Sequence, residues 1–285
     1  MADIAYFGRD KKSVPAPEIA YDSQVPAEVE DAFRSTTRII FGSEHRGIKR
    51  FREWMLRRTI PMRKVKGAFG IPTYKVDGLP VIRDIPADRL VTLEEGMELS
   101  KKPIAIKKGE TLPLAEALSR VSRVAYFSVE FVDGQNDNCV DTPSIFTGSN
   151  TYHVWDTTES KRSAYSAGVI RSEGIFGGYL RALQSQFCIN CFDPTNLKRC
   201  FEVDSSYSCS DCYFCHNCEN VSDSMFCSNL KAARYAICNT VVGKEEYLRV
   251  KAVLLSYINA QLEKNGSLSE SIFNIPSKKR KAKSK

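Results

Sequence analysis

The stretch from residue 124 to residue 243 constrains the fold most, because it repeats and shows no helical period. It contains only three lysines and is rich in Ser, Asn, Cys and aromatic residues. When the sequence is shifted against itself so that Cys188 aligns with Cys209, Trp155 aligns with Phe176. A repeat of about 20 residues is typical of one turn of a β-solenoid, in which short strands wind round an interior of stacked side chains. We therefore predict that this stretch forms a β-solenoid.

The segments on either side of the repeat show helical periodicity instead. Apolar residues at helical spacing predict helices over residues 27–40, 44–58, 114–121 and 244–264. Ser43 is the expected N-cap of the second helix, which is amphipathic and basic. Between the second and third helices, residues 67–113 are broken by Gly and Pro. This part of the chain is expected to alternate short β-like pieces with turns.

These segments predict an α+β fold class with the repeat as its central module. The predicted parts are an extended arm (1–26), a mixed α/β N-terminal region with the basic helix (27–122), a Cys-rich β-solenoid-like repeat (123–243), a capping helix (244–264) and a basic tail (265–285). A solenoid needs its open ends covered. We therefore expect the helix that follows the repeat to cap its C-terminal end, and the N-terminal region to cover the other.

The composition of the 285-residue chain suits a folded protein without a membrane span. It is 42% hydrophobic and 26% charged, which is enough apolar material for a core, and it has no apolar run of membrane-spanning length. The N-terminus does not resemble a signal peptide. A cytoplasmic location is therefore expected, and disulfides are rare there. The ten cysteines are then expected to be metal ligands, redox groups or buried apolar residues.

Nine of the ten cysteines fall between residues 188 and 238, many of them three residues apart. Paired C-x-x-C is a spacing that zinc sites use, because two thiolates on a tight turn face one tetrahedral ion. The candidate metal ligands are Cys188, Cys191, Cys209, Cys212, Cys215 and Cys218. Structural zinc is one interpretation, a buried ladder of thiols is a second, and a redox or iron–sulfur role is a third. Spacing alone leaves all three open.

Two short segments carry the positive charge of the protein, whose net charge is +7. Residues 44–66 hold nine Lys and Arg against two Glu, and the tail from Ser277 to Lys285 holds six more without an acidic residue. Such segments favour an anionic partner, either nucleic acid or an acidic protein surface. The candidate contacts are Arg46, Lys49, Arg50, Arg57, Arg58, Arg63, Lys64, Lys66, Lys278, Lys279, Arg280 and Lys281.

Residues 200–247 resemble a known kind of repeat segment. C-x-x-C strings precede Lys231-Ala-Ala-Arg234-Tyr235-Ala-Ile-Cys-Asn, and Lys244-Glu-Glu-Tyr247 then opens a helix. This pattern is similar to uncharacterised Cys-rich repeat proteins of archaea, candidate bacterial phyla and their mobile elements. The resemblance covers about a sixth of the chain and implies no established activity.

The sequence favours a non-catalytic protein. It contains no Walker A or G-x-G-x-x-G string, no H-E-x-x-H and no G-x-S-x-G. The favoured hypothesis is a structural or assembly protein that uses the solenoid as a rigid scaffold or docking surface, alone or in a larger complex. The alternative is a DNA- or RNA-binding protein with a zinc-stabilised Cys-rich module.

Overall fold

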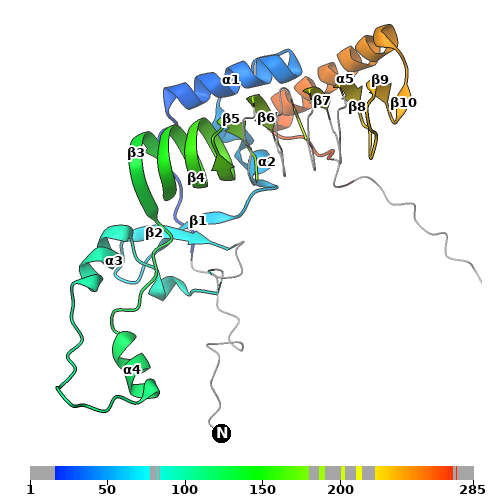
Figure 1. Ribbon diagram of the computed structural model, residues 1–285. Coiled ribbons are helices and arrows are strands. Elements are labelled where there is room, and N and C mark those ends of the chain that lie inside the picture. The colour runs from blue at the N-terminus through cyan, green and yellow to red at the C-terminus, as the bar shows by residue number, and fades with distance from the viewer. Residues whose placement is uncertain are drawn as a thin grey trace, which may run out of the picture. The chain divides into compact units, whose positions relative to one another are not determined.

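The computed structural model places most of the chain in two compact units (Figure 1). It describes residues 17–77, 82, 84–179, 186–189, 200–202, 210–213, 222–271 and 274, with side chains left out at 186–188 and 210–212. Unit 1 comprises Met1–Asp22 and Pro61–Phe131, and unit 2 comprises Ser23–Ile60 and Val132–Lys285. Residues 23–60 therefore group with the repeat, while the domain limits drawn from the sequence stay predictions.

Unit 2 is built on a β-solenoid, which confirms the predicted architecture of the repeat. Its strands are β3 (Phe131–Val140), β4 (Ser144–Ile170), β5 (Glu173–Phe176), β6 (Gln186–Ile189), β7 (Ser210–Tyr213), β8 (Ser222–Met225), β9 (Arg234–Ile237) and β10 (Thr240–Val241). Parallel pairing places Lys161 beside Glu173 and Ser222 beside Arg234. The turns are therefore much shorter than the predicted repeat, and the predicted length of a turn is wrong.

A three-residue period lies inside each turn. Every third residue from Thr147 to Gly177 has a positive φ, and the same holds from Asp223 to Cys238. The left-handed residue bends the chain, and the residue after it points into the solenoid. These interior residues are Thr151, Val154, Thr157, Ser160, Ser163, Ser166, Val169, Ser172 and Ile175, and all are buried. The shift that aligns Cys188 with Cys209 is therefore a whole number of these triplets rather than one turn.

The interior is narrow, and this explains its small side chains. A Cβ atom at the interior position Gly178 would lie 2.6 Å from the Ile175 side chain. Serine fits there and also pairs the backbone. Ser163 Oγ donates to the Lys161 carbonyl at 3.0 Å and accepts from the Ile175 N–H at 3.3 Å, one turn further on. Each such hydroxyl satisfies two buried backbone groups that the tight bends leave without strand partners.

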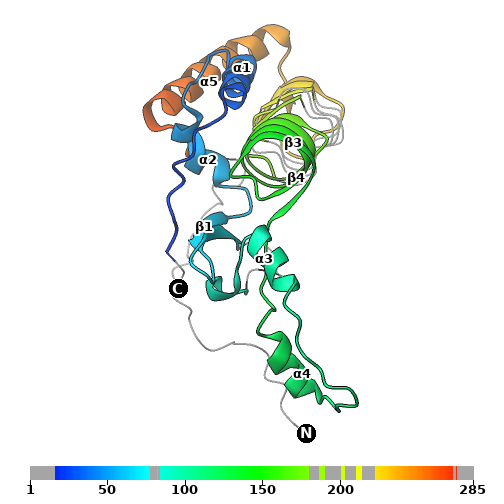
Figure 2. The same ribbon diagram turned by 90° about the vertical axis from the view of Figure 1, so that its left-hand side faces the viewer.

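Helices cover one side of the solenoid, as the end-on view in Figure 2 shows. They are α1 (Ala27–Phe41), the short 3-10 helix η1 (Ile48–Phe51), α2 (Arg52–Leu56) and α5 (Lys244–Asn265). On this side the outward residues of successive turns form one column: Tyr152, Ala164, Phe176, Ile189, Phe201, Tyr213 and Met225. The Phe33 ring of α1 lies 5.5 Å from Phe176, and Phe41 lies 5.0 Å from Phe201. The core of unit 2 therefore has two parts, one inside the solenoid and one beneath the helices.

Helix α5 has nearly the predicted bounds but not the predicted place. Its Tyr247 packs against Tyr235 of β9, and Lys251 lies 4.8 Å from the Tyr213 ring, two turns back along the solenoid. Further on, Asn259 donates to the Phe41 carbonyl at 2.9 Å. The helix thus runs along the side of the solenoid, so the predicted cap over its end is wrong.

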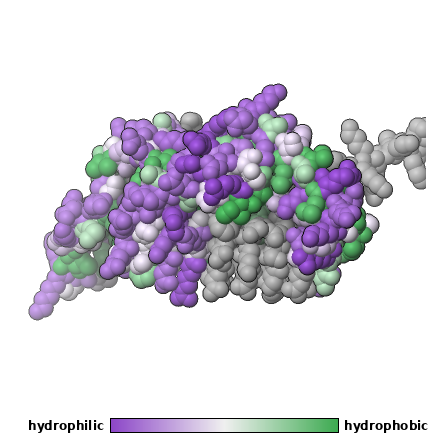
Figure 3. Space-filling model, turned by 90° about the horizontal axis from the view of Figure 1, so that it is seen from above, coloured by the Kyte–Doolittle hydropathy of each residue, from purple (hydrophilic) through white to green (hydrophobic). Residues whose placement is uncertain are grey.

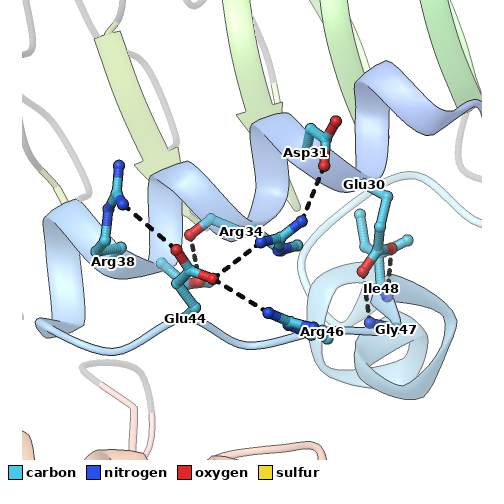
Figure 4. Close-up of polar contacts among 9 residues, drawn as sticks. Glu30, Asp31, Arg34, Arg38, Glu44, Arg46, Gly47 and Ile48 are labelled. Atoms are coloured by element: carbon cyan, nitrogen blue, oxygen red, sulfur yellow. Dashed lines mark hydrogen bonds and ion pairs between the residues drawn. The ribbon is translucent and has the colours of Figure 1, made fainter.

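The basic segment forms a much shorter helix than the one predicted over residues 44–58. Gly47 has a positive φ of 74°, and η1 and α2 begin only after it. The Glu30 carboxylate of α1 accepts from the N–H groups of Gly47 and Ile48 at 2.5 and 2.9 Å, and so takes the capping role expected of Ser43 (Figure 4). A carboxylate from another helix is invisible to local capping rules.

Unit 1 is a smaller α and β unit. A hairpin pairs β1 (Met62–Lys66) with β2 (Pro72–Val76), followed by the 3-10 helix η2 (Ala87–Arg89), α3 (Leu93–Ser100) and α4 (Leu114–Val121). Val65, Val76, Leu90 and Val91 are among its buried residues. Helix α4 was predicted with the same bounds. The β-like pieces expected between residues 67 and 113 were 80–85, 89–93 and 103–107. The last two are not strands, much of the first lies outside the described residues, and the hairpin was not predicted.

Candidate functional site

A buried polar cluster lies beneath the helix-covered side of the solenoid. Tyr152, His153 and Tyr165 are each at most 2% exposed. Burial and the nearby Arg52 guanidinium lower the pKa of His153 to about 4, while Asp141 opposes that shift. Burial also raises the pKa of Tyr165. All three side chains are therefore uncharged at neutral pH. They are buried within unit 2.

The predicted metal ligands are only partly within the described residues. Cys191, Cys209, Cys215 and Cys218 lie outside them. The backbone of the other two is described: β6 aligns Cys188 with Ile175, and β7 aligns Cys212 with Ser224. Ile175 and Ser224 are both fully buried interior residues. Register therefore pairs these two positions with interior residues of the neighbouring turns. Among the residues that the structure describes, no group of three His, Cys, Asp or Glu is arranged to hold a metal ion.

Two of the described thiols donate the same backward hydrogen bond as the interior serines. Cys227 Sγ donates to the Met225 carbonyl at 3.3 Å, and Cys139 Sγ donates to the Asp137 carbonyl at 3.4 Å. Both bonds reach two residues back along the chain, as that of Ser163 does. A cysteine can therefore make the donor half of this bonding pattern, although sulfur is a weaker hydrogen-bonding atom than oxygen.

Three of the predicted basic contacts hold the C-terminal segment of unit 2. Arg50 donates to the Glu263 carbonyl in the last turn of α5, and Arg57 donates to the Leu268 carbonyl at 2.7 Å. Arg58 donates to Ser271 Oγ at 3.1 Å. Cations at a helix C-terminus stabilise its unpaired carbonyls. Helical periodicity predicted that these arginines lie on a basic face. It could not reveal their partner, because the C-terminal segment lies near the other end of the sequence.

The other basic candidates are distributed over both units. In unit 2, Arg46 lies 3.8 Å from Glu44, and Lys49 donates to the Ser23 carbonyl at 2.6 Å. In unit 1, Arg63 pairs with Asp77 at 2.6 Å, Lys64 lies 5.7 Å from the Tyr74 ring, and Lys66 is exposed. Lys278, Lys279, Arg280 and Lys281 lie outside the described residues. A role for these residues in binding nucleic acid stays a prediction.

Figure 4 shows how charge is balanced between α1 and the loop that follows it. Glu44 accepts from Arg34 at 3.0 Å and from Arg38 at 3.4 Å. The hydrogen bond from Arg34 lowers the pKa of Glu44, so its carboxylate is ionised at neutral pH. One acidic side chain thus faces three arginines, with Arg46 the third. Part of the predicted basic surface is neutralised within the chain.

One cleft of unit 2 is lined by charged residues, and its charges are partly paired. It lies between α1 and β5, has a volume of about 510 Å³ and is lined by Glu28, Asp31, Arg162 and Glu173. Arg162 and Glu173 form an ion pair with one another, one turn apart on the solenoid. Arg171 and Glu159 pair in the same way at 2.9 Å. Both pairs join neighbouring turns of the solenoid.

Exposed apolar side chains are concentrated in unit 1, and none of them belongs to the site residues predicted from the sequence. Among the described residues, nine of the sixteen exposed large apolar side chains belong to it, although unit 2 is much the larger. They are Phe69, Ile71, Met97, Ile106, Leu114, Leu118, Val121, Phe127 and Phe131. Seen from the helix-bearing side, most of the described surface is polar and the apolar patches are separate (Figure 3). Concentrated exposed apolar residues are typical of an interaction surface.

Comparison of the chain with protein-family models, with curated proteins and with solved structures finds no match. Within the described part of the chain, no helix has the length and apolarity needed to span a bilayer.

Proposed function

We propose that this chain is a non-catalytic structural protein that associates with copies of itself. In this proposal the solenoid of unit 2 is the rigid scaffold and unit 1 supplies the contact surface. The observation that carries it is the number of large apolar side chains that unit 1 exposes, including three on α4 alone. Water contact with such residues is unfavourable, and association removes it.

The scaffold role is supported by how unit 2 is built. Its solenoid interior pairs backbone groups through serine hydroxyls, and its outer column is buried under three helices and η1. A repeat held in this way keeps a fixed spacing from turn to turn. Its surface ion pairs join neighbouring turns, as in Arg234 with Asp223 and Arg171 with Glu159. A regular rigid body suits a protein whose task is to hold a shape.

The test is the mass of the full chain in solution. Light scattering coupled to size-exclusion chromatography, over the low to high micromolar range, should show a mass that rises above that of the 32.0 kDa chain. A protein that remains a monomer at every concentration contradicts the proposal. A parallel titration with single-stranded and duplex DNA and RNA tests the nucleic-acid alternative, which requires binding that weakens as salt rises.

A further inference from the structure

Helix α4 presents an apolar face to solvent. Leu114, Leu118 and Val121 are 74%, 57% and 43% exposed, and they recur at i, i+4 and i+7. This spacing places them on one stripe of the helix. Such a stripe normally faces a core, yet no residue of α4, which the structure describes in full, is buried.

The opposite face of α4 is fixed to the loop before it. Arg120 pairs with Glu110 and Glu116, and it donates to the Ala105 carbonyl at 3.2 Å. One guanidinium balances only one of these two carboxylates. The segment from Lys107 to Arg123 is nevertheless net positive, with four Lys and Arg against two Glu, and Lys107, Lys108 and Arg123 are exposed. The apolar stripe therefore lies in a segment with a net charge of +2.

The same unit carries a cleft with the complementary character. Its volume is about 340 Å³, and Phe69 and Leu99 provide its apolar lining beside Glu94, Glu95 and Glu98. Phe69 is 54% exposed, so a large aromatic surface is open to a ligand. Burial, reinforced by Glu94 and Glu95, raises the pKa of the neighbouring Glu130, as expected where negative charge accumulates. One residue of the lining, Lys102, is basic.

We propose that the α4 stripe of one copy binds the acidic cleft over α3 of a second copy of this chain. Apolar side chains then meet Phe69 and Leu99. The net positive charge of the α4 segment faces the three glutamates of the cleft, of which Glu98 already pairs with Lys101. A short amphipathic helix in an apolar groove is a recurrent mode of protein recognition. Helix α4 itself contains no aromatic residue of the kind that anchors helices in membrane interfaces, which favours a protein partner over a lipid surface.

This inference rests on the proposed function, and it specifies the geometry of assembly. The stripe and the cleft are different surfaces, so every copy has one of each and the contact is head to tail. Such a contact closes into a ring or extends as a filament, according to the rotation between neighbours. A symmetric dimer would instead pair one surface with itself.

Two variants separate the surfaces. Leu118→Asp removes the stripe and leaves the cleft, whereas the double variant Glu94→Lys/Glu98→Lys reverses the rim of the cleft and leaves the stripe. All three side chains are exposed, so the fold should be retained. The matched control is Val253→Asp, an apolar residue of α5 in unit 2 that is 64% exposed. Each variant is studied as the full chain by sedimentation velocity, and unfolding curves verify that it is folded.

Each of the two variants alone should be a monomer, with self-association weakened at least about tenfold. Mixed in equal amounts, they should form a one-to-one dimer that grows no further, because only one intact stripe and one intact cleft meet. Val253→Asp should assemble like the wild type. Wild-type assembly that survives Leu118→Asp, or a mixture that stays monomeric, overturns this inference and leaves the proposed function standing. A monomeric wild type overturns both.

Discussion

The two units of this protein treat their apolar residues in opposite ways. Unit 2 buries its apolar residues in two regions, one inside the solenoid and one beneath its helices, whereas unit 1 leaves many of them exposed to water. The difference indicates a division of labour, in which apolar area gives stability in one unit and is available for association in the other. If so, equivalent substitutions in the two units should affect different properties.

The strongest test truncates an apolar side chain in each unit. Phe176→Ala removes a ring of the outer column that packs against Phe33, and it should lower the free energy of unfolding by about 3–5 kcal/mol. Both tryptophans, Trp54 and Trp155, lie in unit 2, so their fluorescence during denaturant unfolding reports this unit.

Leu118→Ala is the matched change in unit 1. Because that side chain is exposed, its removal should alter stability by no more than about 0.5 kcal/mol. Self-association should weaken instead. Equal losses of stability in the two variants would contradict the division of labour.

The buried histidine gives unit 2 a pH dependence that exposed groups do not. The folded-state pKa of His153 is about 4, below its ordinary value of 6.5, so the unfolded chain takes up the proton first as the pH falls. The stability that this group provides is complete above pH 6.5 and is lost as the pH falls through about 4. A shift of this size corresponds to about 3 kcal/mol.

The measurement is the difference in unfolding free energy between the wild type and His153→Asn, followed from pH 7 to pH 4. Asparagine is suitable because the residue has a φ of 53°, a conformation that asparagine tolerates. The pH slope of the variant should be shallower by the amount that His153 contributes. Parallel slopes would mean that the imidazole is not kept neutral by its surroundings.

The repeat in the sequence correctly predicts a solenoid but indicates the wrong number of residues per turn, for a physical reason. Because small residues recur at every third position, the sequence matches itself at any shift divisible by three. The shift that aligns Cys188 with Cys209 is one of these, and it is easily mistaken for the length of one turn. The length of a turn depends on which outward residues stack, such as Tyr152, Ala164 and Phe176, and these are chemically diverse. The turn that begins at Ile175 and ends beside it at Cys188 is also longer than the one from Lys161 to Glu173, which further blurs a strict period.

The sites were harder to predict than the fold, because they depend on contacts between distant segments. Arg50 and Arg57 were expected to face an external anion, yet they bond the C-terminal segment of their own unit. Helix α4 was predicted with correct bounds, but periodicity cannot tell whether an apolar stripe faces the core or the solvent. Only the fold shows that Leu118 is exposed.

Interior hydroxyls provide a smaller test of how unit 2 is stabilised. Ser163→Ala removes the acceptor of the buried Ile175 N–H and should cost about 1–3 kcal/mol of unfolding free energy. Ser163→Cys should cost less, because Cys227 makes the same backward hydrogen bond in this fold. The comparison uses the same tryptophan-monitored unfolding. If the cysteine variant is the less stable of the two, serine and cysteine are not interchangeable inside the solenoid.

The smallest effect is expected from removing metal. Cys188 and Cys212 align with buried interior residues, and Cys191, Cys209, Cys215 and Cys218 continue the three-residue spacing of that interior in the sequence. Successive triplets face the solenoid axis from successive sides, whereas a zinc site draws four thiolates to one point about 2.3 Å from each sulfur. We therefore predict buried thiols in place of ligands.

Protein purified without added metal should contain no stoichiometric zinc, and a chelator should leave its unfolding midpoint unchanged. A structural zinc ion contributes on the order of 10 kcal/mol in small zinc domains, so the two outcomes are far apart. Denatured protein titrated with a thiol reagent supplies the control, since all ten cysteines should then react. Zinc that leaves together with the fold would identify a metal site among these cysteines. The cysteine-bearing turns and the hydroxyl-lined turns around Ser163 would then be stabilised by different chemistry within one solenoid.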